Sequence, residues 1–346
     1  MDKLLKLQVA ILVCLVAVSF FVRLGIVRGQ AESGDVSLQN PTGTVSQQTE
    51  PSNPKEPTQP PTEEPTQAPT EPEIVLTFGE DFSLASREYF LYHCSSEKVL
   101  HSFGDMDKRV FPASVTKLFT AYVVLQYMNP DQVVTIGSEI NQVAPDSSLA
   151  YLKQGQRITI RDLVEGMLLP SGNDAAYALA VATARTHYGD AGLPVEAAVA
   201  TFVSLMNKNA SQLGMTGTHF MNPDGYHDPD HYTTCNDLIT IAKLAMENDV
   251  IMRCVGKHED EVTLSSGEVV HWRNTNAIIN PESQYYCENA IGLKTGNTRA
   301  AGFCLLSAFE VDGEYIIIGS FACQRPEDRF IDTLKLYDVY INAVRE

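Results

Sequence analysis

The stretch Phe111-Pro112-Ala113-Ser114-Val115-Thr116-Lys117-Leu118-Phe119-Thr120-Ala121 decides how the rest of the chain is interpreted. Pro112 suits the first turn of a helix but cannot continue one from its N-terminal side. Because the residues that follow are apolar at helical spacing, the pattern predicts a largely buried helix with Ser114 in its opening turn. Lys117 lies one turn further along the same face. The free N–H groups at such a helix start favour negative charge beside Ser114.

Ser114 and Lys117 thus hold a hydroxyl and an amine side by side, the minimum for a serine nucleophile whose proton is accepted by lysine. The same spacing occurs at Ser95 and Lys98, where strand-like apolar runs on both sides predict a tight turn instead. A serine three residues before a lysine is also common at the start of an ordinary helix with a solvated lysine. The spacing therefore needs partners elsewhere in the chain before it predicts chemistry.

The first candidate partner is Ser171-Gly172-Asn173, which lies between two predicted helices. Pro170 ends one helix, and Asn173 or Asp174 is expected to cap the next. The segment predicts a fixed turn that presents the Ser171 hydroxyl and the Asn173 amide to a cleft. Taken alone it is also ordinary turn chemistry.

The second candidate partner is Lys294-Thr295-Gly296-Asn297, which follows strand-like residues. Lys294 and Gly296 are expected to project to one side of that strand. A lysine there supplies a cation for a substrate carboxylate, and the missing side chain of Gly296 lets a substrate backbone approach. Taken alone, the segment is equally compatible with a solvated lysine before a turn.

Together, Ser114 with Lys117, Ser171 with Asn173, and the Lys294 segment resemble the motif set of class A β-lactamases and penicillin-binding proteins. Over about residues 75–346 the chain resembles the low-molecular-mass penicillin-binding proteins, which are serine-type D-alanyl-D-alanine carboxypeptidases. Two further segments carry the resemblance, namely Phe220-Met221-Asn222-Pro223-Asp224-Gly225 with the following His231-Tyr232-Thr233-Thr234, and Asn274-Thr275-Asn276.

The resemblance implies a reaction on peptidoglycan stem peptides. Ser114 attacks the carbonyl between the two terminal D-alanines and becomes an acyl-ester, while Lys117 accepts its proton. Ser171 helps to relay the proton, and Asn173 helps to hold the substrate. A β-lactam antibiotic mimics the dipeptide and leaves Ser114 acylated. The resemblance implies neither a cofactor nor a metal.

It also implies how the end of the substrate is held. Lys294 and Thr295 meet the terminal carboxylate beside Gly296. The backbone N–H groups of Ser114 and Asn297 form the oxyanion hole, in which one lost donor typically raises the barrier by a few kcal/mol. Arg329 is a further candidate for the carboxylate.

The periodicity outside the motifs predicts an α/β (α+β) fold in which helices flank one antiparallel sheet and form an insertion at its side. The resemblance implies a β-lactamase/transpeptidase-like version of it. Asp312-Gly313 marks a tight hairpin turn. The predicted strands cover residues 88–94, 99–103, 132–136, 157–160, 290–293, 302–309 and 314–323, and a further hairpin is predicted over 261–270. The predicted helices begin near Ser114 and cover residues 160–169, 174–186, 194–213, 236–247 and 327–344.

The N-terminal part has a different composition. Residues 1–30 contain a long apolar run after Lys3 and Lys6, which predicts an export signal or membrane anchor. Residues 31–74 hold nine of the eighteen prolines and predict an extended Pro/Thr/Glu-rich linker. The catalytic domain is expected over 75–346. It would lie outside the cytoplasm, tethered to the cell membrane by its N-terminal anchor, or be secreted if the signal is cleaved.

Composition restricts the possible functions. A formal net charge of −18 argues against a nucleic-acid partner. Six cysteines follow Cys14 without a C-x-x-C pair, which argues against a metal cluster and predicts no particular disulfide. His227 and His231 suggest a metal site and hence a metallo-carboxypeptidase, but Pro229 argues against a helix that would align the two histidines. Three functions compete with the carboxypeptidase: a DD-endopeptidase acting on cross-links, a serine β-lactamase and a non-catalytic wall-peptide sensor.

Overall fold

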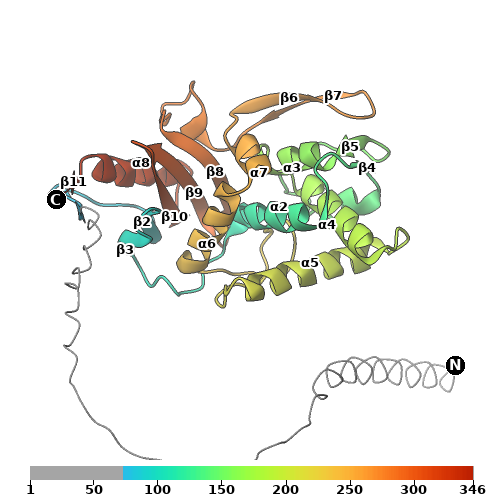
Figure 1. Ribbon diagram of the computed structural model, residues 1–346, viewed down its shortest axis with the longest axis horizontal. Coiled ribbons are helices and arrows are strands. Elements are labelled where there is room, and N and C mark those ends of the chain that lie inside the picture. Colours follow the sequence, from blue (N-terminus) through green and yellow to red (C-terminus); the bar gives the residue numbers. More distant parts are fainter. Residues whose placement is uncertain (1–72, 346) are drawn as a thin grey trace, which may run out of the picture. The chain divides into compact units, whose positions relative to one another are not determined.

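The computed structural model describes residues 73–345. Its centre is a five-stranded antiparallel sheet in the order β3-β2-β10-β9-β8 (Figure 1). The N-terminal hairpin therefore pairs with the C-terminal strands, and β3 and β8 form the two edges. The strands are β2 (Glu88–His93), β3 (Lys98–Phe103), β8 (Ala290–Thr298), β9 (Gly302–Val311) and β10 (Glu314–Cys323).

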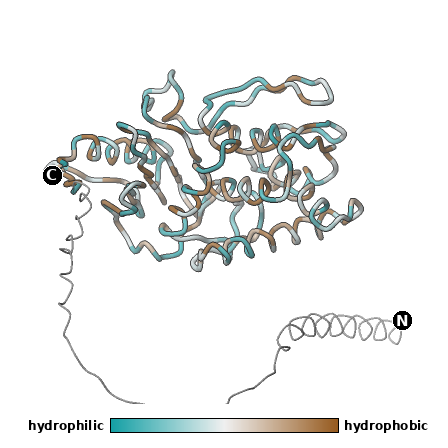
Figure 2. Tube along the Cα trace, in the orientation of Figure 1, coloured by the Kyte–Doolittle hydropathy of each residue, from teal (hydrophilic) through white to brown (hydrophobic). Residues whose placement is uncertain are grey.

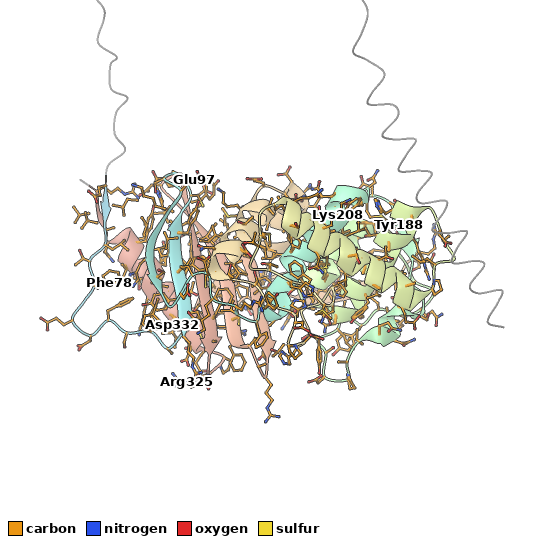
Figure 3. The ribbon with its side chains drawn as sticks, turned by 90° about the horizontal axis from the view of Figure 1, so that it is seen from below. Phe78, Glu97, Tyr188, Lys208, Arg325 and Asp332 are labelled. Carbon is orange, nitrogen blue, oxygen red and sulfur yellow. The ribbon has the colours of Figure 1, made fainter. Side chains whose placement is uncertain are left out.

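The sheet has two buried faces, because its side chains point alternately to opposite sides. On one face, Leu305, Phe309 and other strand residues pack against the C-terminal helix α8 (Asp328–Ile341). On the other face, Leu306 and Ala308 join the larger core that contains the remaining helices. Figure 3 shows the sheet from below, with Asp332 marking the end that carries α8, and Tyr188 and Lys208 the helical part. The molecule is thus built in layers, with α8 on one side of the sheet and the helical part on the other.

The helical part is organised around a buried helix. This helix, α2 (Thr116–Tyr127), follows a single 3₁₀ turn, η1 (Ala113–Val115), and lies between the sheet and helices α4 and α5 (Figure 1). Hydrophobic and hydrophilic residues alternate along α5, as expected for a helix with one buried face (Figure 2). The other helices are α3 (Ile160–Leu168), α4 (Asn173–Tyr188), α5 (Val195–Gln212), α6 (Cys235–Met246) and α7 (Asp249–Val255).

Shorter elements connect these layers. Small antiparallel pairs form between β4 and β5, between β6 and β7, and between β1 and β11. Short 3₁₀ helices η2 and η3 accompany them. Their bounds are β1 (Ile74–Val75), β4 (Val133–Thr135), η2 (Ser138–Gln142), β5 (Arg157–Thr159), β6 (Glu259–Thr263), β7 (Val269–Arg273), η3 (Ala277–Ile279) and β11 (Val344–Arg345).

The predicted fold class is confirmed, and the departures are local. The cap predicted at Asn173 or Asp174 is wrong: Gly172 occupies the N-cap position of α4 without a side-chain hydrogen bond. The closing helix ends at Ile341 rather than at residue 344, because the chain then pairs with β1. Helix α7 was not predicted. Strand β8 continues through the Lys294 segment to Thr298, because β9 pairs with it along that length.

The predicted signal or anchor (residues 1–30) lies outside the described residues, as does the predicted linker up to residue 72. Among residues 73–345, no helix has the length and apolar character needed to cross a membrane. The six cysteines of this part are free thiols, and burial raises the pKa of Cys235, Cys254 and Cys304 to about 12. These thiols therefore behave as small core residues.

Candidate active site

The turn that carries Ser114 is held between two glycines from distant parts of the chain. Ala113 has a left-handed backbone (φ 48°). A Cβ on Gly225 would lie 1.9 Å from the Ala113 carbonyl oxygen, and one on Gly296 would lie 2.8 Å from the Pro112 carbonyl oxygen. Since only glycine permits such approaches, the loop around Gly225 and the strand β8 fix the turn from two sides. Sequence reasoning predicted a close approach at Gly296, although for a substrate backbone.

Lys117 is fully buried and reaches three oxygens. Its Nζ lies 2.8 Å from Ser114 Oγ, 2.8 Å from Asn173 Oδ1 and 2.6 Å from the Asp224 carbonyl oxygen. The amide and carbonyl oxygens can only accept, whereas a hydroxyl can donate. A neutral amine therefore satisfies all three partners by donating to Asn173 and Asp224 while its lone pair accepts from Ser114. Burial lowers the pKa of Lys117 to about 8, although Asp224 and Asp174 oppose that shift.

The second motif lines the same cavity as Ser114. Ser171 has a left-handed backbone (φ 62°), a conformation that is enriched at functional sites in residues other than glycine. Asn173 donates from Nδ2 to Ser147 Oγ at 2.9 Å, which orients its amide oxygen toward Lys117. Within the described residues, no hydrogen bond joins Ser171 to Lys117 or Lys294. A relay through Ser171 thus needs the substrate to complete it.

Class A β-lactamases and penicillin-binding proteins carry S-D-N as their second motif, whereas this chain has Gly172 in place of the aspartate. A Cβ at this position would lie 2.6 Å from the Gly166 carbonyl oxygen and 2.8 Å from the Ala150 Cβ. Trp272 packs against the same Gly166 and donates from its indole N–H to the Ala150 carbonyl at 3.0 Å. No side chain larger than hydrogen fits between these groups, so an aspartate is excluded by packing.

The third motif lies on β8, at the edge of the sheet. Thr295, Gly296 and Asn297 line the cavity, whereas the Lys294 side chain is buried and its Nζ contacts the Thr295 carbonyl at 3.2 Å and Thr275 Oγ1 at 3.4 Å. Burial, then the charges of Lys117 and Arg329, hold the pKa of Lys294 well below its usual range. The two amines therefore influence each other's protonation, and each loses its proton at a lower pH than a free lysine does.

Thr275 belongs to this site, although only the family resemblance drew attention to its segment. Its hydroxyl lies 2.5 Å from Thr295 Oγ1, and the residue lines the cavity. The neighbouring Asn276 is buried and caps the short helix η3 by accepting from the Ile278 N–H at 3.2 Å. The segment thus fixes the hydroxyl of Thr295.

Arg329 reaches the site from α8. Its Nη1 donates to the Gly296 carbonyl at 3.1 Å, and the residue lines the cavity. Its Nε is buried and has no hydrogen-bond partner among the described residues. Arg329 therefore supports the strand that carries the motif, and its guanidinium places a positive charge in the wall of the cavity.

His231, which the sequence suggested both as a metal ligand and as part of the family resemblance, has a structural place. Met221 donates its N–H to His231 Nδ1 at 3.2 Å, and His231 Nε2 lies 2.9 Å from Thr116 Oγ1. Burial lowers the pKa of His231 to about 3, which keeps the ring neutral. Its partner in the metal hypothesis, His227, packs instead against Phe111. Among the described residues, no group of three or more His, Cys, Asp or Glu side chains could hold a metal.

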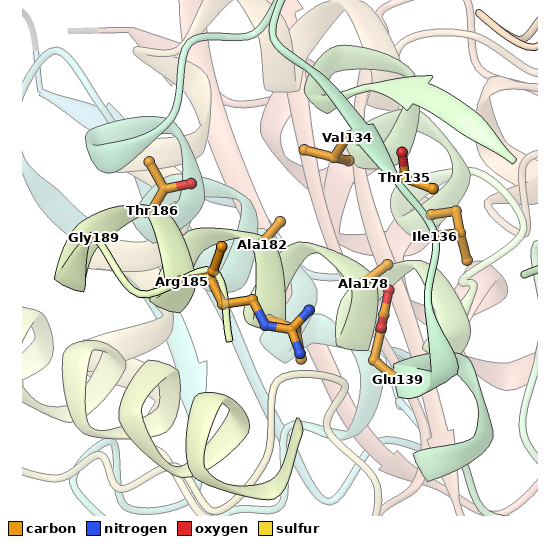
Figure 4. Close-up of a pocket in the computed structure, with 11 residues that line it drawn as sticks. Val134, Thr135, Ile136, Glu139, Ala178, Ala182, Arg185, Thr186 and Gly189 are labelled. Carbon is orange, nitrogen blue, oxygen red and sulfur yellow. The ribbon is translucent and has the colours of Figure 1, made fainter. Parts of the chain in front are cut away.

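The cavity above Ser114 has a volume of about 800 Å³. Asp146, hydrogen-bonded to Tyr226 at 2.9 Å, lies on one part of its wall, and Arg299 and Arg329 lie on another. A separate cavity of about 410 Å³ lies beside α4 (Figure 4), with Arg185 and Glu139 in its wall. None of the three motifs contributes to that second cavity. The larger cavity is therefore the one that joins the motifs.

The sequence of this chain matches known proteins of one family. A family model described as D-alanyl-D-alanine carboxypeptidase matches residues 75–319. A D-alanyl-D-alanine carboxypeptidase of a Streptomyces species is 36% identical over 220 residues, which cover 61% of this chain and 72% of that protein. DacC of Escherichia coli, which has the same name, is 30% identical over 263 residues, 73% of this chain and 60% of DacC. The chain thus spans about 60% of the length of DacC.

Solved structures give the same result. The crystal structure of the Streptomyces K15 DD-transpeptidase superposes with a TM-score of 0.67 at 31% identity, covering 75% of this chain and 98% of that one. Penicillin-binding protein D2 of Listeria monocytogenes, solved with ampicillin bound, gives a TM-score of 0.61 at 26% identity, covering 76% and 100%. The chain belongs to the serine-type D-alanyl-D-alanine carboxypeptidases, the low-molecular-mass penicillin-binding proteins that its three motifs predicted.

Proposed function

We propose that this protein is a peptidoglycan hydrolase that removes the terminal D-alanine from stem peptides through an acyl-enzyme on Ser114. One observation carries the proposal: the buried Lys117 amine lies 2.8 Å from Ser114 Oγ at a cavity of about 800 Å³. Its other two partners are oxygens that can only accept. The amine is thereby poised to take the serine proton.

Each step follows from a group in or beside this cavity. Ser114 Oγ forms a bond to the carbonyl carbon of the penultimate D-alanine as its proton passes to Lys117 Nζ. Return of that proton, aided by Ser171, lets D-alanine leave as a neutral amine. The N–H groups of Ser114 and Asn297 hold the developing oxyanion. Asn173 holds the peptide, and Lys294, Thr295 and Arg329 bind the terminal carboxylate beside Gly296.

The test is release of D-alanine from diacetyl-L-lysyl-D-alanyl-D-alanine, run beside labelling by a fluorescent penicillin. We expect release, and slow stoichiometric labelling that a β-lactamase would not give. Penicillin binding without any release would contradict the carboxypeptidase and favour a sensor of wall peptides. Rapid hydrolysis of nitrocefin would instead identify a β-lactamase.

The acceptor of the acyl group is a separate question. One solved neighbour is named a DD-transpeptidase, and a DD-endopeptidase acting on cross-links uses the same acyl-enzyme. The assay therefore includes dimeric muropeptides and an added amine. Water is the acceptor that we propose, so D-alanine release should exceed both cleavage of dimers and transfer to the amine.

We also propose that residues 1–30 tether the enzyme to the outer side of the cell membrane and that residues 31–74 act as a spacer reaching into the wall. The proposal rests on the apolar run after Lys6 and on the nine prolines that follow. Cell fractionation of the full chain, with and without residues 1–30, provides the test. Recovery of an uncleaved chain in the membrane fraction supports the tether, and a cleaved chain in the medium contradicts it.

A further inference from the structure

The loop Asn222-Pro223-Asp224-Gly225 makes a second contact with the catalytic pair that the proposed mechanism does not use. Its backbone is fixed by Thr120, which donates to the Pro223 carbonyl at 2.7 Å, and by Asn222, which accepts the Gly225 N–H at 2.8 Å. The Asp224 carbonyl then receives Lys117 Nζ at 2.6 Å. This brings the carboxylate of the same residue close to the base.

That carboxylate is buried with few hydrogen-bond partners. Asp224 is 1% exposed, and its Oδ1 accepts the Tyr226 N–H at 3.1 Å. Burial raises the pKa of Asp224, whereas Lys117, the Tyr226 N–H and the Asn173 side chain act in the opposite direction. Its Oδ2 is buried and has no hydrogen-bond partner among the described residues. No described lysine or arginine nitrogen forms an ion pair with it. A buried carboxylate oxygen left in this state is costly, so it calls for an explanation.

Asp174, which also acts on Lys117, shows what a structural carboxylate looks like in the same site. It accepts N–H bonds from Ala150 at 2.8 Å, Leu152 at 3.0 Å and Ala175 at 3.0 Å. Its charge is thereby used to hold the wall segment of the cavity. The N–H that Asp224 accepts comes from Tyr226, only two positions away, so this bond holds no distant segment in place.

The groups that face the Lys117–Asp224 pair come from several elements. Asp174 on α4 and Asp224 favour the ammonium form of Lys117. Lys294 on β8, whose pKa burial holds well below its usual range, and the neutral His231 ring share its surroundings. Tyr177 on α4 faces Asp224, and burial raises its pKa well above its usual range, so it stays neutral throughout the assay. Of the two carboxylates that favour the ammonium form of Lys117, Asp224 is therefore the one that does not hold the wall of the cavity.

We propose that Asp224 is a positioning residue whose ionised carboxylate stabilises the Lys117 ammonium that forms when Ser114 is acylated. Its carbonyl aligns the amine, and its charge, acting through a water-poor interior, makes the amine a stronger base. The proton moves from Ser114 Oγ to Lys117 Nζ as the bond from Oγ to the carbonyl carbon forms, and Asp224 itself takes no proton. The inference rests on the proposed role of Ser114 and Lys117.

The test is the pH profile of acylation by a fluorescent penicillin in Asp224→Asn, a change that keeps the shape and the backbone carbonyl. Loss of the charge should lower the pKa of Lys117, so the acidic limb of the profile of acylation rate against pH should shift to lower pH by about one unit. The rate at high pH should fall as well, because a weaker base accepts the proton less readily. A merely structural role would lower the rate at every pH and leave the limb in place, and that outcome would overturn the proposal.

Asp230→Asn is the matched control, since it removes an exposed carboxylate from the segment that follows this loop. Its limb should coincide with that of the wild type. If Asp224→Asn does not fold, ¹³C NMR of carboxyl-labelled wild-type protein gives the answer: Asp224 should be ionised at pH 8, and a protonated acid would refute the proposal. Failure of wild-type labelling would refute the proposed function instead, so the two failures are distinguishable.

Discussion

Two segments of this protein place a serine three residues before a lysine, and they differ in everything except that spacing. Ser95 and Lys98 lie at the turn between β2 and β3, where Glu97 has a left-handed backbone (φ 52°) and the lysine is exposed. Ser114 and Lys117 lie in a continuous turn of helix, with the lysine fully buried and 2.8 Å from the serine. In one segment the amine faces water, and in the other it faces three oxygens of the protein.

The difference shows what the spacing needs in order to become chemistry. A helix brings positions three apart onto one face, whereas a tight turn does not. Burial then lowers the pKa of the amine, as it does for Lys117, to a range where the neutral base exists at working pH. Each of the following predictions tests the comparison at one of these points.

The largest effect is expected at the serines. Ser114→Ala should abolish both fluorescent penicillin labelling and D-alanine release, because it removes the hydroxyl that forms the acyl-ester. Ser95→Ala should leave both unchanged. Labelling that persists in Ser114→Ala would mean that another residue is the nucleophile.

The lysines come next. Lys117→Ala removes the proton acceptor and should slow acylation by a factor of about 10²–10⁴, while Lys98→Ala should match the wild type in stopped-flow labelling. Circular dichroism of both variants checks that the fold is retained. Equal rates for the two variants would remove the distinction between the segments.

The packing around the nucleophile should matter less than its base. Gly225→Ala puts a Cβ 1.9 Å from the Ala113 carbonyl oxygen and should displace the Ser114 turn, slowing acylation by about 10²-fold. Gly214→Ala is the control, because its φ of 76° is similar but its Cβ would meet nothing within 4 Å. Urea unfolding should show a cost of about 1 kcal/mol for Gly214→Ala and more for Gly225→Ala. Normal acylation in Gly225→Ala would show that the loop does not hold the turn.

The smallest effect is that of pH on the wild-type enzyme. Lys117 must be neutral to accept a proton, and its pKa is lowered by burial to about 8. Acylation should therefore rise as the pH rises through 8, by about five-fold between pH 7 and pH 8. A rate that falls over this interval would mean that the ammonium is the active form.

The sequence predicted most of what local pattern controls. The apolar spacing after Pro112 identified the buried helix, and the run from Gly302 to Cys323 identified the central hairpin of the sheet. The three motifs do meet at one cavity, as their resemblance to a family implied. Each of these features depends on residues close together in the chain or on motifs that are specific as a set.

What escaped prediction depends on backbone atoms and long-range packing. The carbonyl of Asp224, 107 positions from Lys117, reaches the base, and no side-chain pattern marks a carbonyl. Gly172 replaces an aspartate because Gly166 and Ala150, held by Trp272, leave no room. His231 is a neutral core residue because burial lowers its pKa, and its partner Met221 lies on the other side of the same loop.

The central claim is that Ser114, and not Ser95, is the serine that carries the acyl group, and peptide mapping tests it directly. Trypsin places the two in separate peptides, residues 110–117 and residues 88–98. After reaction of the full chain with benzylpenicillin, mass spectrometry should find the penicilloyl adduct on the peptide 110–117, at Ser114. An adduct on the peptide 88–98, or no covalent adduct at all, would contradict the account.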